Sequence, residues 1–239
     1  MAKKGQYLEK SVQQSRTISE SKYKTTRDEK RLLLMAMVSE NRDEIFKERW
    51  FDFKLADYAA TFNLDNHEAS RDTQKAIEML VDRWIFLRQE DGAFEKVRWI
   101  DAVRNDPKYG TKGIRFTQEM IKVLMNQPDR FEYQLSEVVS LDSPEHIRIY
   151  DWVYEVCMAA DDGVGFVELT LAEMLDRLQL HNHNSYKIYG NFKRVVLKPA
   201  VKKVSENTSM TLSFREIKEG RKVVAIEFKG ELDKESLLK

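Results

Sequence analysis

Residues 181–203, HNHNSYKIYGNFKRVVLKPAVKK, hold the side chains of this sequence that are best suited to chemistry. Two histidines flank an asparagine, two tyrosines follow, and the stretch ends in basic residues without a single carboxylate. A histidine pair with a nearby tyrosine can serve as the metal ligands and the nucleophile of a metal-dependent nuclease. A basic helix is instead typical of a protein that recognises base edges in the major groove of DNA. The rest of the sequence has to decide between these two functions.

The nuclease hypothesis, of the rolling-circle type, requires His181 and His183 to bind a divalent metal while Tyr186 or Tyr189 attacks the phosphodiester. Such enzymes place their histidines around a hydrophobic residue on a strand, whereas here the middle residue is Asn182 and no strand is expected. No Asp or Glu occurs between residues 177 and 205 to complete a set of ligands. The sequence therefore favours a polar turn, and the tyrosine nuclease stays as an alternative.

The DNA-reading hypothesis requires a helix, which Asn184 or Ser185 could cap. From that start, basic and amide side chains recur every three or four residues and form one stripe, and apolar side chains form the opposite one. The polar stripe consists of Lys187, Asn191, Arg194, Lys198 and Lys202, and the apolar side of Tyr189, Phe192, Val196 and Ala200. Arg and Lys donate to guanine and Asn pairs with adenine, so this face is suited to reading bases. Pro199 is expected to kink the helix, or to break it after Lys198.

The elements around this helix predict a winged-helix domain. A helix over residues 144–160 begins with a proline, a strand is expected at 164–170, and an amphipathic helix at 171–180. Residues 210–230 alternate on both sides of 218–221, which is typical of a β-hairpin. In this order the third helix enters the major groove. The hairpin, or wing, carries basic residues that we expect to contact flanking phosphates: Lys218, Arg221 and Lys222.

The first half of the chain shows the same order of elements. Thr26 and Glu29 have the spacing of a capping box in front of an apolar helix. Two amphipathic helices are expected at 53–64 and 67–83, and a hairpin is expected from segments 94–103 and 112–120. LADYAATFNL (55–64) also aligns in register with LAEMLDRLQL (171–180). The sequence therefore predicts an α+β fold of two tandem winged-helix domains related by pseudo-duplication.

We expect an N-terminal domain over residues 1–138, with a flexible arm at 1–25, and a C-terminal domain over residues 139–239. The 67–83 helix mixes acidic and basic residues, which favours contacts to the DNA backbone or to protein over base reading. The N-terminal domain nevertheless carries basic residues that are candidates for phosphate contacts: Arg71, Lys75, Lys108 and Lys112.

The composition limits the classes of function. There are 40 basic and 40 acidic residues, so any nucleic-acid surface must come from local clustering of charge. Cys157 is the single cysteine, which excludes an intrachain disulfide and a cysteine zinc cluster. The apolar run at 32–38 is too short for a bilayer, and no apolar region follows Lys3 and Lys4, so we expect no membrane, no signal peptide and a cytoplasmic location. No GxxxxGK[ST] loop occurs and no cofactor is indicated.

Residues 189–228 form the most specific motif: an aromatic residue, Phe-Lys-Arg, Val-Leu, Pro-Ala and then Gly-Arg-Lys-Val. Together with residues 15–38 and 113–154, this stretch resembles the Rep_3 family of iteron-binding plasmid replication initiators. The resemblance implies a bacterial, plasmid-encoded, non-enzymatic protein that binds double-stranded DNA at the direct repeats (iterons) of an origin and promotes opening of that origin. A winged-helix repressor without a role in initiation stays as an alternative.

The resemblance also implies partners and a division of labour. Monomers would bind the repeats, and a homodimer in equilibrium with them would repress the initiator's own gene at an inverted repeat. A host initiator ATPase and the replicative helicase would follow. The N-terminal domain would contact backbone and dimerise, and the C-terminal domain would read sequence.

The base-reading residues would lie on a helix over 186–203: Lys187, Asn191, Lys193, Arg194 and Lys198. Lys193 lies off the stripe, and Val195 stands where family members often have a basic residue. Further phosphate contacts are expected from Asn184, Tyr186, Lys202 and Lys203.

Overall fold

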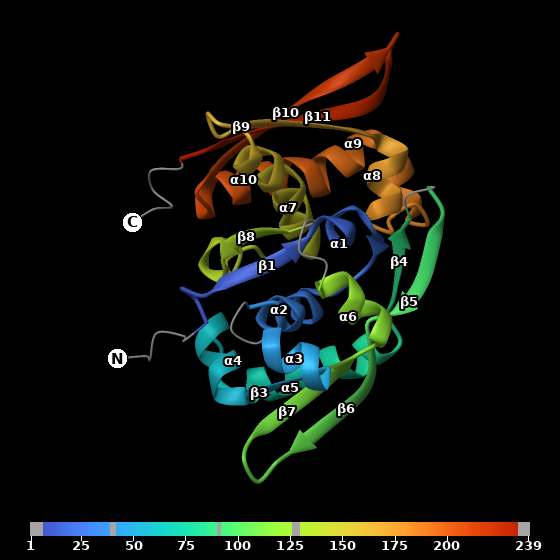
Figure 1. Ribbon diagram of the computed structural model, residues 1–239. Helices are drawn as coiled ribbons and strands as arrows, with labels where there is room; N and C mark the ends of the chain where they lie inside the picture. Colours follow the sequence, from blue (N-terminus) through green and yellow to red (C-terminus); the bar gives the residue numbers. More distant parts are fainter. Residues whose placement is uncertain (1–6, 39–41, 90–91, 126–129, 234–239) are drawn as a thin grey trace. The chain divides into compact units, whose positions relative to one another are not determined.

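The computed structural model describes residues 7–38, 42–89, 92–125 and 130–233 (Figure 1). The chain divides into two compact units, Met1–Val139 and Ser140–Lys239, which are described separately below. In the described residues, no helix combines the length and the apolar character needed to cross a membrane.

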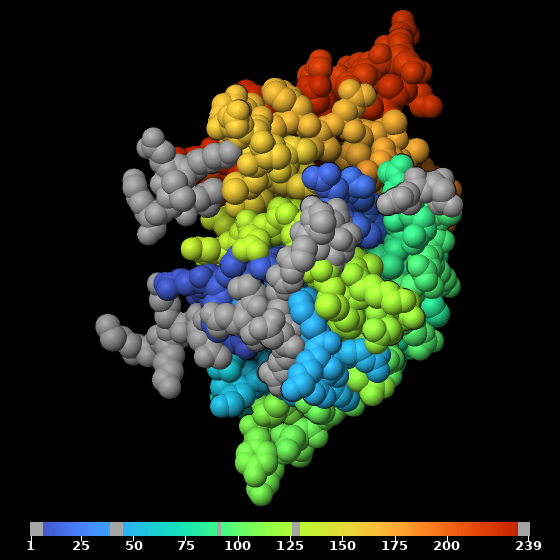
Figure 2. All heavy atoms as spheres, in the orientation of Figure 1, coloured from blue at the N-terminus to red at the C-terminus, as the bar shows by residue number. Residues whose placement is uncertain are grey.

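The second unit has the expected order of a winged helix. It opens with α7 (Pro144–Ala159), β9 (Val164–Thr170) and α8 (Leu171–Arg177). A 3₁₀ turn, η4 (Asn184–Lys187), leads into one continuous helix made of α9 (Tyr189–Phe192), the π turn η5 (Lys193–Leu197) and α10 (Lys198–Asn207). The hairpin β10 (Met210–Glu219) and β11 (Lys222–Leu232) then completes a sheet of order β10-β11-β9. Figure 2 shows the tip of this hairpin standing clear of the atoms around it.

Residues close together in the sequence determine where these elements begin and end. Pro144 occupies the first turn of α7, and the Ser143 hydroxyl accepts a hydrogen bond from the Glu145 amide. At the hairpin turn, Gly220 has a φ of 60°, a left-handed conformation that favours glycine. The strand at 164–170 and the hairpin around 218–221 are therefore confirmed as the sequence predicts them.

Two glycines let α7 lie close against its sheet. Gly165 of β9 and Gly230 of β11 are partners in the strand register, and both face Cys157 of α7. A Cβ atom added at Gly165 would lie 2.7 Å from the Cys157 backbone nitrogen and 2.6 Å from Cγ2 of Val156. The helix backbone therefore leaves no room for a side chain at this position.

We expect Gly165→Ala to lower the free energy of unfolding by about 1–3 kcal/mol, because an overpacked core must shift backbone rather than a side chain. Gly190→Ala is the matched control, since a Cβ atom there meets nothing within 4 Å and alanine favours a helix. Urea unfolding of the two variants and the parent chain measures both effects. Equal stability of Gly165→Ala and the parent would contradict the close approach.

The first unit contains a second winged helix with additional elements. Its first described elements are β1 (Ser11–Ser15), α1 (Arg16–Glu20), β2 (Lys22–Tyr23), α2 (Arg27–Ala36) and α3 (Arg42–Glu48). The central ones are β3 (Trp50–Lys54), α4 (Leu55–Phe62), α5 (Asn66–Val81), β4 (Trp84–Arg88) and β5 (Phe94–Arg98). The last are β6 (Ile100–Asp106), β7 (Thr111–Phe116), α6 (Gln118–Met125), β8 (Arg130–Gln134) and the 3₁₀ turn η3 (Leu135–Glu137).

The two units repeat one topology. The strands of the first unit's wing are ordered β3-β7-β6, which is the order β9-β11-β10 of the second unit. The aligned segments 55–64 and 171–180 also end alike, because Asn63 and Gln179 have φ values of 52° and 54°. The next amide then bonds back five residues in both cases, from Leu64 to Ala59 at 2.9 Å and from Leu180 to Leu175 at 2.8 Å. This shared left-handed helix end explains why the amide and the final leucine match in sequence.

The expected flexible arm at 1–25 is wrong for its described part beyond residue 10. β1 pairs with β8, with Ser11 opposite Gln134, and Val12 and Ile18 are fully buried. The partner strand lies more than a hundred residues away, so the local polar composition could not reveal this pairing. Residues 1–6 lie outside the described residues.

The expected hairpin of the first unit also has different bounds. Segment 94–103 spans two strands, because β5 pairs with β4 whereas β6 pairs with β7. The change of partner occurs at the fully buried Trp99. Segment 112–120 likewise leaves the hairpin after Phe116 and enters α6, and the start of segment 53–64 belongs to β3. Apolar and polar residues alternate without interruption across these boundaries between elements, so the sequence pattern did not reveal where one element ends and the next begins.

The predicted capping box at the start of α2 is confirmed, and it is linked to a distant residue. The Glu29 amide donates to the Thr26 hydroxyl at 3.3 Å, and the Glu29 carboxylate accepts from the Thr26 amide at 2.5 Å. Glu29 is fully buried, and its carboxylate also pairs with Arg83 at 2.8 Å. The cap is therefore part of a buried ion pair that joins α2 to the end of α5.

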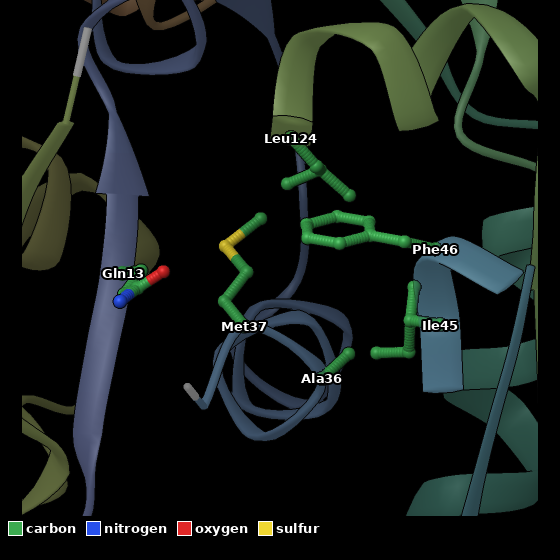
Figure 3. Close-up of a pocket in the computed structure, with 6 residues that line it drawn as sticks. All are labelled: Gln13, Ala36, Met37, Ile45, Phe46 and Leu124. Carbon is green, nitrogen blue, oxygen red and sulfur yellow. The ribbon is translucent and has the colours of Figure 1, made fainter. Parts of the chain in front are cut away.

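A small apolar cavity lies among β1, α2, α3 and α6 (Figure 3). Its volume is about 20 Å³, which is room for about one water molecule. In Figure 3, the Phe46 ring extends toward Leu124 and Met37. This cavity is a gap in core packing and is too small for a ligand.

Candidate nucleic-acid interface

The helix that the sequence predicts to read DNA, called the reading helix below, begins later than expected and also ends later. It runs from Tyr189 to Asn207 rather than over 186–203, and neither Asn184 nor Ser185 caps it. The Ser185 hydroxyl pairs with the His183 Nδ1 atom at 2.8 Å, and the Ser185 carbonyl accepts from the side-chain Nδ2 of Asn191 at 3.0 Å. The two expected caps therefore belong to the 3₁₀ turn in front of the helix, and Asn191 holds that turn from within the helix.

Pro199 does not break the helix. α10 continues through it, and the residues before it form a π turn in which the Lys198 amide bonds to the Lys193 carbonyl. In a regular α-helix, a proline ring clashes with the carbonyl four residues earlier and leaves it without a donor. The wider π turn redirects the carbonyls in front of Pro199, and such turns often occur at functional sites.

The two sides of this helix differ in burial as the sequence predicts. Phe192, Val196 and Ala200 are buried, and Tyr189 is half-buried. Arg194, Lys198 and Lys202 are exposed. An open groove of about 340 Å³ runs along the cationic side and is lined by Arg194, Lys198, Pro199, Lys202, Lys203 and Glu206. The helix therefore presents a row of cations backed by the apolar core.

Lys193 points to the wing, where Glu216 binds it. The Glu216 carboxylate lies 2.6 Å from the Lys193 ammonium, accepts from the Tyr189 hydroxyl at 2.6 Å and pairs with Lys218 at 3.4 Å. The hydrogen bond from Lys193 is the largest cause that lowers the pKa of Glu216 to about 2. Sequence reasoning missed Glu216, although it is an acid on a wing strand opposite a helix rich in cations.

We expect Glu216→Gln to remove stability that depends on pH. Because the pKa of Glu216 is lowered on folding, its contribution is present above its ordinary pKa of 4.5 and is lost as pH falls toward about 2. The difference in unfolding free energy between the parent chain and Glu216→Gln should therefore be largest near pH 6 and shrink steadily below about pH 4.5. Urea unfolding across this range measures it, and a difference that does not change with pH would show that the contacts of Glu216 with Lys193 and Tyr189 do not stabilise the folded chain.

The polar turn in front of the helix holds the remaining expected residues. Lys187 and Asn184 are exposed, whereas the half-buried Tyr186 stacks on His183 with ring centroids 4.6 Å apart and meets the Phe192 ring edge-on. His181 lies 3.8 Å from Asp176. In the described part of the chain, no three His, Cys, Asp or Glu side chains are grouped as metal ligands.

Tyr189, one of the two tyrosines that a nuclease could use, is poorly suited to the reaction. Burial, followed by the hydrogen bond to Glu216, raises the pKa of Tyr189, which makes its phenolate harder to form. A covalent reaction with phosphate would need that phenolate or a base to accept the proton.

The expected phosphate contacts of the second unit occupy different positions. Lys202 is exposed and lies 3.8 Å from Glu206 on the same helix, whereas Lys203 pairs with Asp142 at 3.3 Å. Arg221 and Lys222 are exposed at the hairpin turn, and Lys218 shares Glu216 with Lys193. The turn of the wing therefore presents two cations to its surroundings.

In the first unit, Lys112 departs from the expectation of a phosphate contact. Its side chain is buried against α5, where its ammonium lies 3.1–3.2 Å from oxygens of Ser70, Thr73 and Gln74. Burial lowers the pKa of Lys112. The alternation of β7 directs this side chain inward, and the residue type alone could not show it. The other expected residues, Arg71, Lys75 and Lys108, are exposed.

Two winged helices, one of them displaying a helix with a cationic face, define this chain as a winged-helix DNA-binding protein. The family model described as "Initiator Replication protein, WH1" matches residues 11–154, and the model described as "Initiator Rep protein, WH2" matches residues 170–229. The chain belongs to this family, the Rep_3 plasmid replication initiators.

Three individual proteins are also similar to this chain, two in sequence and one in structure. The chain is 27% identical over 224 residues to a replication initiation protein of Escherichia coli, covering 90% of this chain and 67% of that protein. It is 26% identical over 216 residues to an uncharacterized 27.6 kDa protein of Escherichia coli, covering 85% and 88%. A crystal structure of the Pi initiator protein in complex with iteron DNA aligns with a TM-score of 0.75 at 18% identity, covering 95% of this chain and 99% of that one, and so shares the fold.

Proposed function

We propose that this chain initiates plasmid replication by binding direct repeats at the origin and promoting the opening of neighbouring duplex. The observation that carries the proposal is the exposed row of cations on the third helix of the second winged helix, the position that enters a major groove in such folds. The Pi initiator protein, which shares this fold, was crystallised with iteron DNA, which supports the same class of ligand here.

We further propose that the second unit reads sequence and that the first contacts backbone and forms the homodimer. The reading helix carries Arg194 and Lys198 without an acidic residue before Glu206. On α5, by contrast, the exposed Arg71 and Lys75 lie between the half-buried Glu68 and the exposed Glu78. Mixed charge of this kind weakens direct reading of bases and is compatible with occasional phosphate contacts. The dimer would act on an inverted repeat as a repressor of its own gene.

The mechanism that follows is non-enzymatic. Two winged helices on consecutive turns of duplex would occupy a repeat of about 20 base pairs. Several chains bound in tandem would deform the adjacent DNA, and steps that unstack easily, such as TA, would open first. A host initiator ATPase and the replicative helicase would then act on the opened strand in the cytoplasm.

Gel-shift and footprinting experiments on the DNA that flanks the gene test this function. We expect protection of several tandem repeats and chemical reactivity of unpaired bases in an adjacent AT-rich segment. Protection of a single inverted repeat without any opening would instead indicate a repressor. Nicking of supercoiled origin DNA with a divalent metal, lost in Tyr186→Phe or Tyr189→Phe, would indicate a nuclease.

A further inference from the structure

Two large apolar side chains are exposed at the start of the reading helix, one just before its first residue and one within it. Ile188, at its N-terminal end, has 64% of its surface exposed, and Val195, in the π turn, has 42%. Phe192 and Leu197 of the same helix are by contrast almost completely buried, with exposures of 1% and 0%. The helix therefore has enough core contacts without these two, and it presents them outward.

Their position distinguishes them from scattered surface hydrophobes, which are common and need no explanation. Val195 follows Arg194 in the chain and precedes Lys198 by three residues, so it lies among the exposed cations. Ile188 follows the exposed Lys187, caps the N-terminus of the helix and lies seven residues before Val195. Both side chains therefore belong to the face that the proposed function directs into the groove.

The major groove offers such side chains one apolar partner on the base edges. Thymine carries a C5-methyl group there beside its O4 acceptor, whereas the base edges of the other three bases carry no methyl group. Contact between an aliphatic side chain and this methyl group removes apolar surface of both partners from water. A cation at residue 195 would instead seek a guanine or a phosphate.

We infer that Val195 and Ile188 are specificity-determining residues that contact the C5-methyl groups of two thymines in the repeat. This inference rests on the proposed function and refines it. Val195 lies seven residues after Ile188, a span of about 10 Å at the rise of a helix. Because base pairs repeat every 3.4 Å along the axis, the two thymines would lie about three base pairs apart.

Replacement of single thymines by deoxyuridine tests the inference, because only the methyl group is removed. We expect the parent chain to lose affinity about fourfold at each of two positions, which corresponds to burial of one methyl-sized group. Val195→Ala should bind the unmodified repeat correspondingly more weakly and should no longer respond to deoxyuridine at one position. Ile188→Ala should lose the response at the other position.

Two further variants separate a methyl contact from a change in the helix. Val103→Ala removes a valine of similar exposure, 46%, from the first unit and should leave the whole deoxyuridine profile unchanged. Val195→Thr keeps one methyl group and should retain part of the response. Thermal unfolding should be nearly the same for all four variants, because the side chains that they alter are exposed.

The outcomes distinguish this inference from the proposed function. If the parent chain prefers the repeat over unrelated DNA but no deoxyuridine changes its affinity, the methyl contacts do not exist and the proposed function stands. A response that Val195→Ala and Ile188→Ala both retain would also overturn the inference. If the parent chain shows no preference for the repeat, the proposed function fails, and the inference fails with it.

Discussion

Arg194→Ala is expected to weaken binding to the repeat by about 1–3 kcal/mol, roughly 5- to 150-fold, and to relax specificity at one base pair. Arg194 is exposed in the π turn of the reading helix and lines the cationic groove. From this position its guanidinium can donate two hydrogen bonds to guanine O6 and N7, which no other base pair accepts in the same geometry. Gel shifts with each base pair of the repeat substituted in turn measure both effects.

Lys202→Ala is the contrasting control. Lys202 is 71% exposed and lies two turns further along the helix, where we expect it to contact phosphate. Its loss should weaken binding to all sequences alike and flatten the dependence of affinity on salt by about one unit of slope. If Arg194→Ala also weakened all sequences alike, Arg194 would be a phosphate contact. If it left affinity and specificity unchanged, our placement of the reading face would be wrong.

Arg83→Met is expected to lower the free energy of unfolding of the first unit by about 3–5 kcal/mol. Its guanidinium donates to both carboxylate oxygens of Glu29, at 2.8 and 3.3 Å. Glu29 is fully buried, so the substitution leaves a carboxylate in the core without its opposite charge. Urea unfolding followed by tryptophan fluorescence measures the change, since Trp99 is fully buried in the same unit.

Two further variants show whether the stability lost in Arg83→Met comes from the uncompensated charge of Glu29. Arg71→Met removes an arginine that is 70% exposed beside Asp72, and such surface pairs contribute about 0–1 kcal/mol. Combining Arg83→Met with Glu29→Gln should recover much of the stability, because the uncompensated charge is gone. A cost below about 1 kcal/mol for Arg83→Met alone would show that the pair is hydrated rather than buried.

Residues near one another in the chain determined most of the fold. Thr26 with Glu29, Ser143 with Pro144, and Gly220 at the hairpin turn act on neighbours within a few positions, so the sequence displays both partners of each signal together. The same holds for the alternating apolar and basic residues of the reading helix, whose periodicity predicted its buried and exposed sides. These local signals were sufficient for the element order of the second unit and for the expectation of two winged helices, whereas in the first unit they missed β1 and the boundary between β5 and β6.

Contacts between distant residues decided what the sequence alone did not. β1 is ordered by β8, Glu29 pairs with Arg83, 54 residues away, and Lys193 with Glu216, 23 residues away. Lys198 is exposed, Lys193 is held by a carboxylate and Lys112 is buried on a strand, although all three have the same side chain. Their roles depend on which oxygen lies within about 3 Å. That distance is set by the tertiary structure, whereas residue type and spacing by themselves determine only which elements form and in what order.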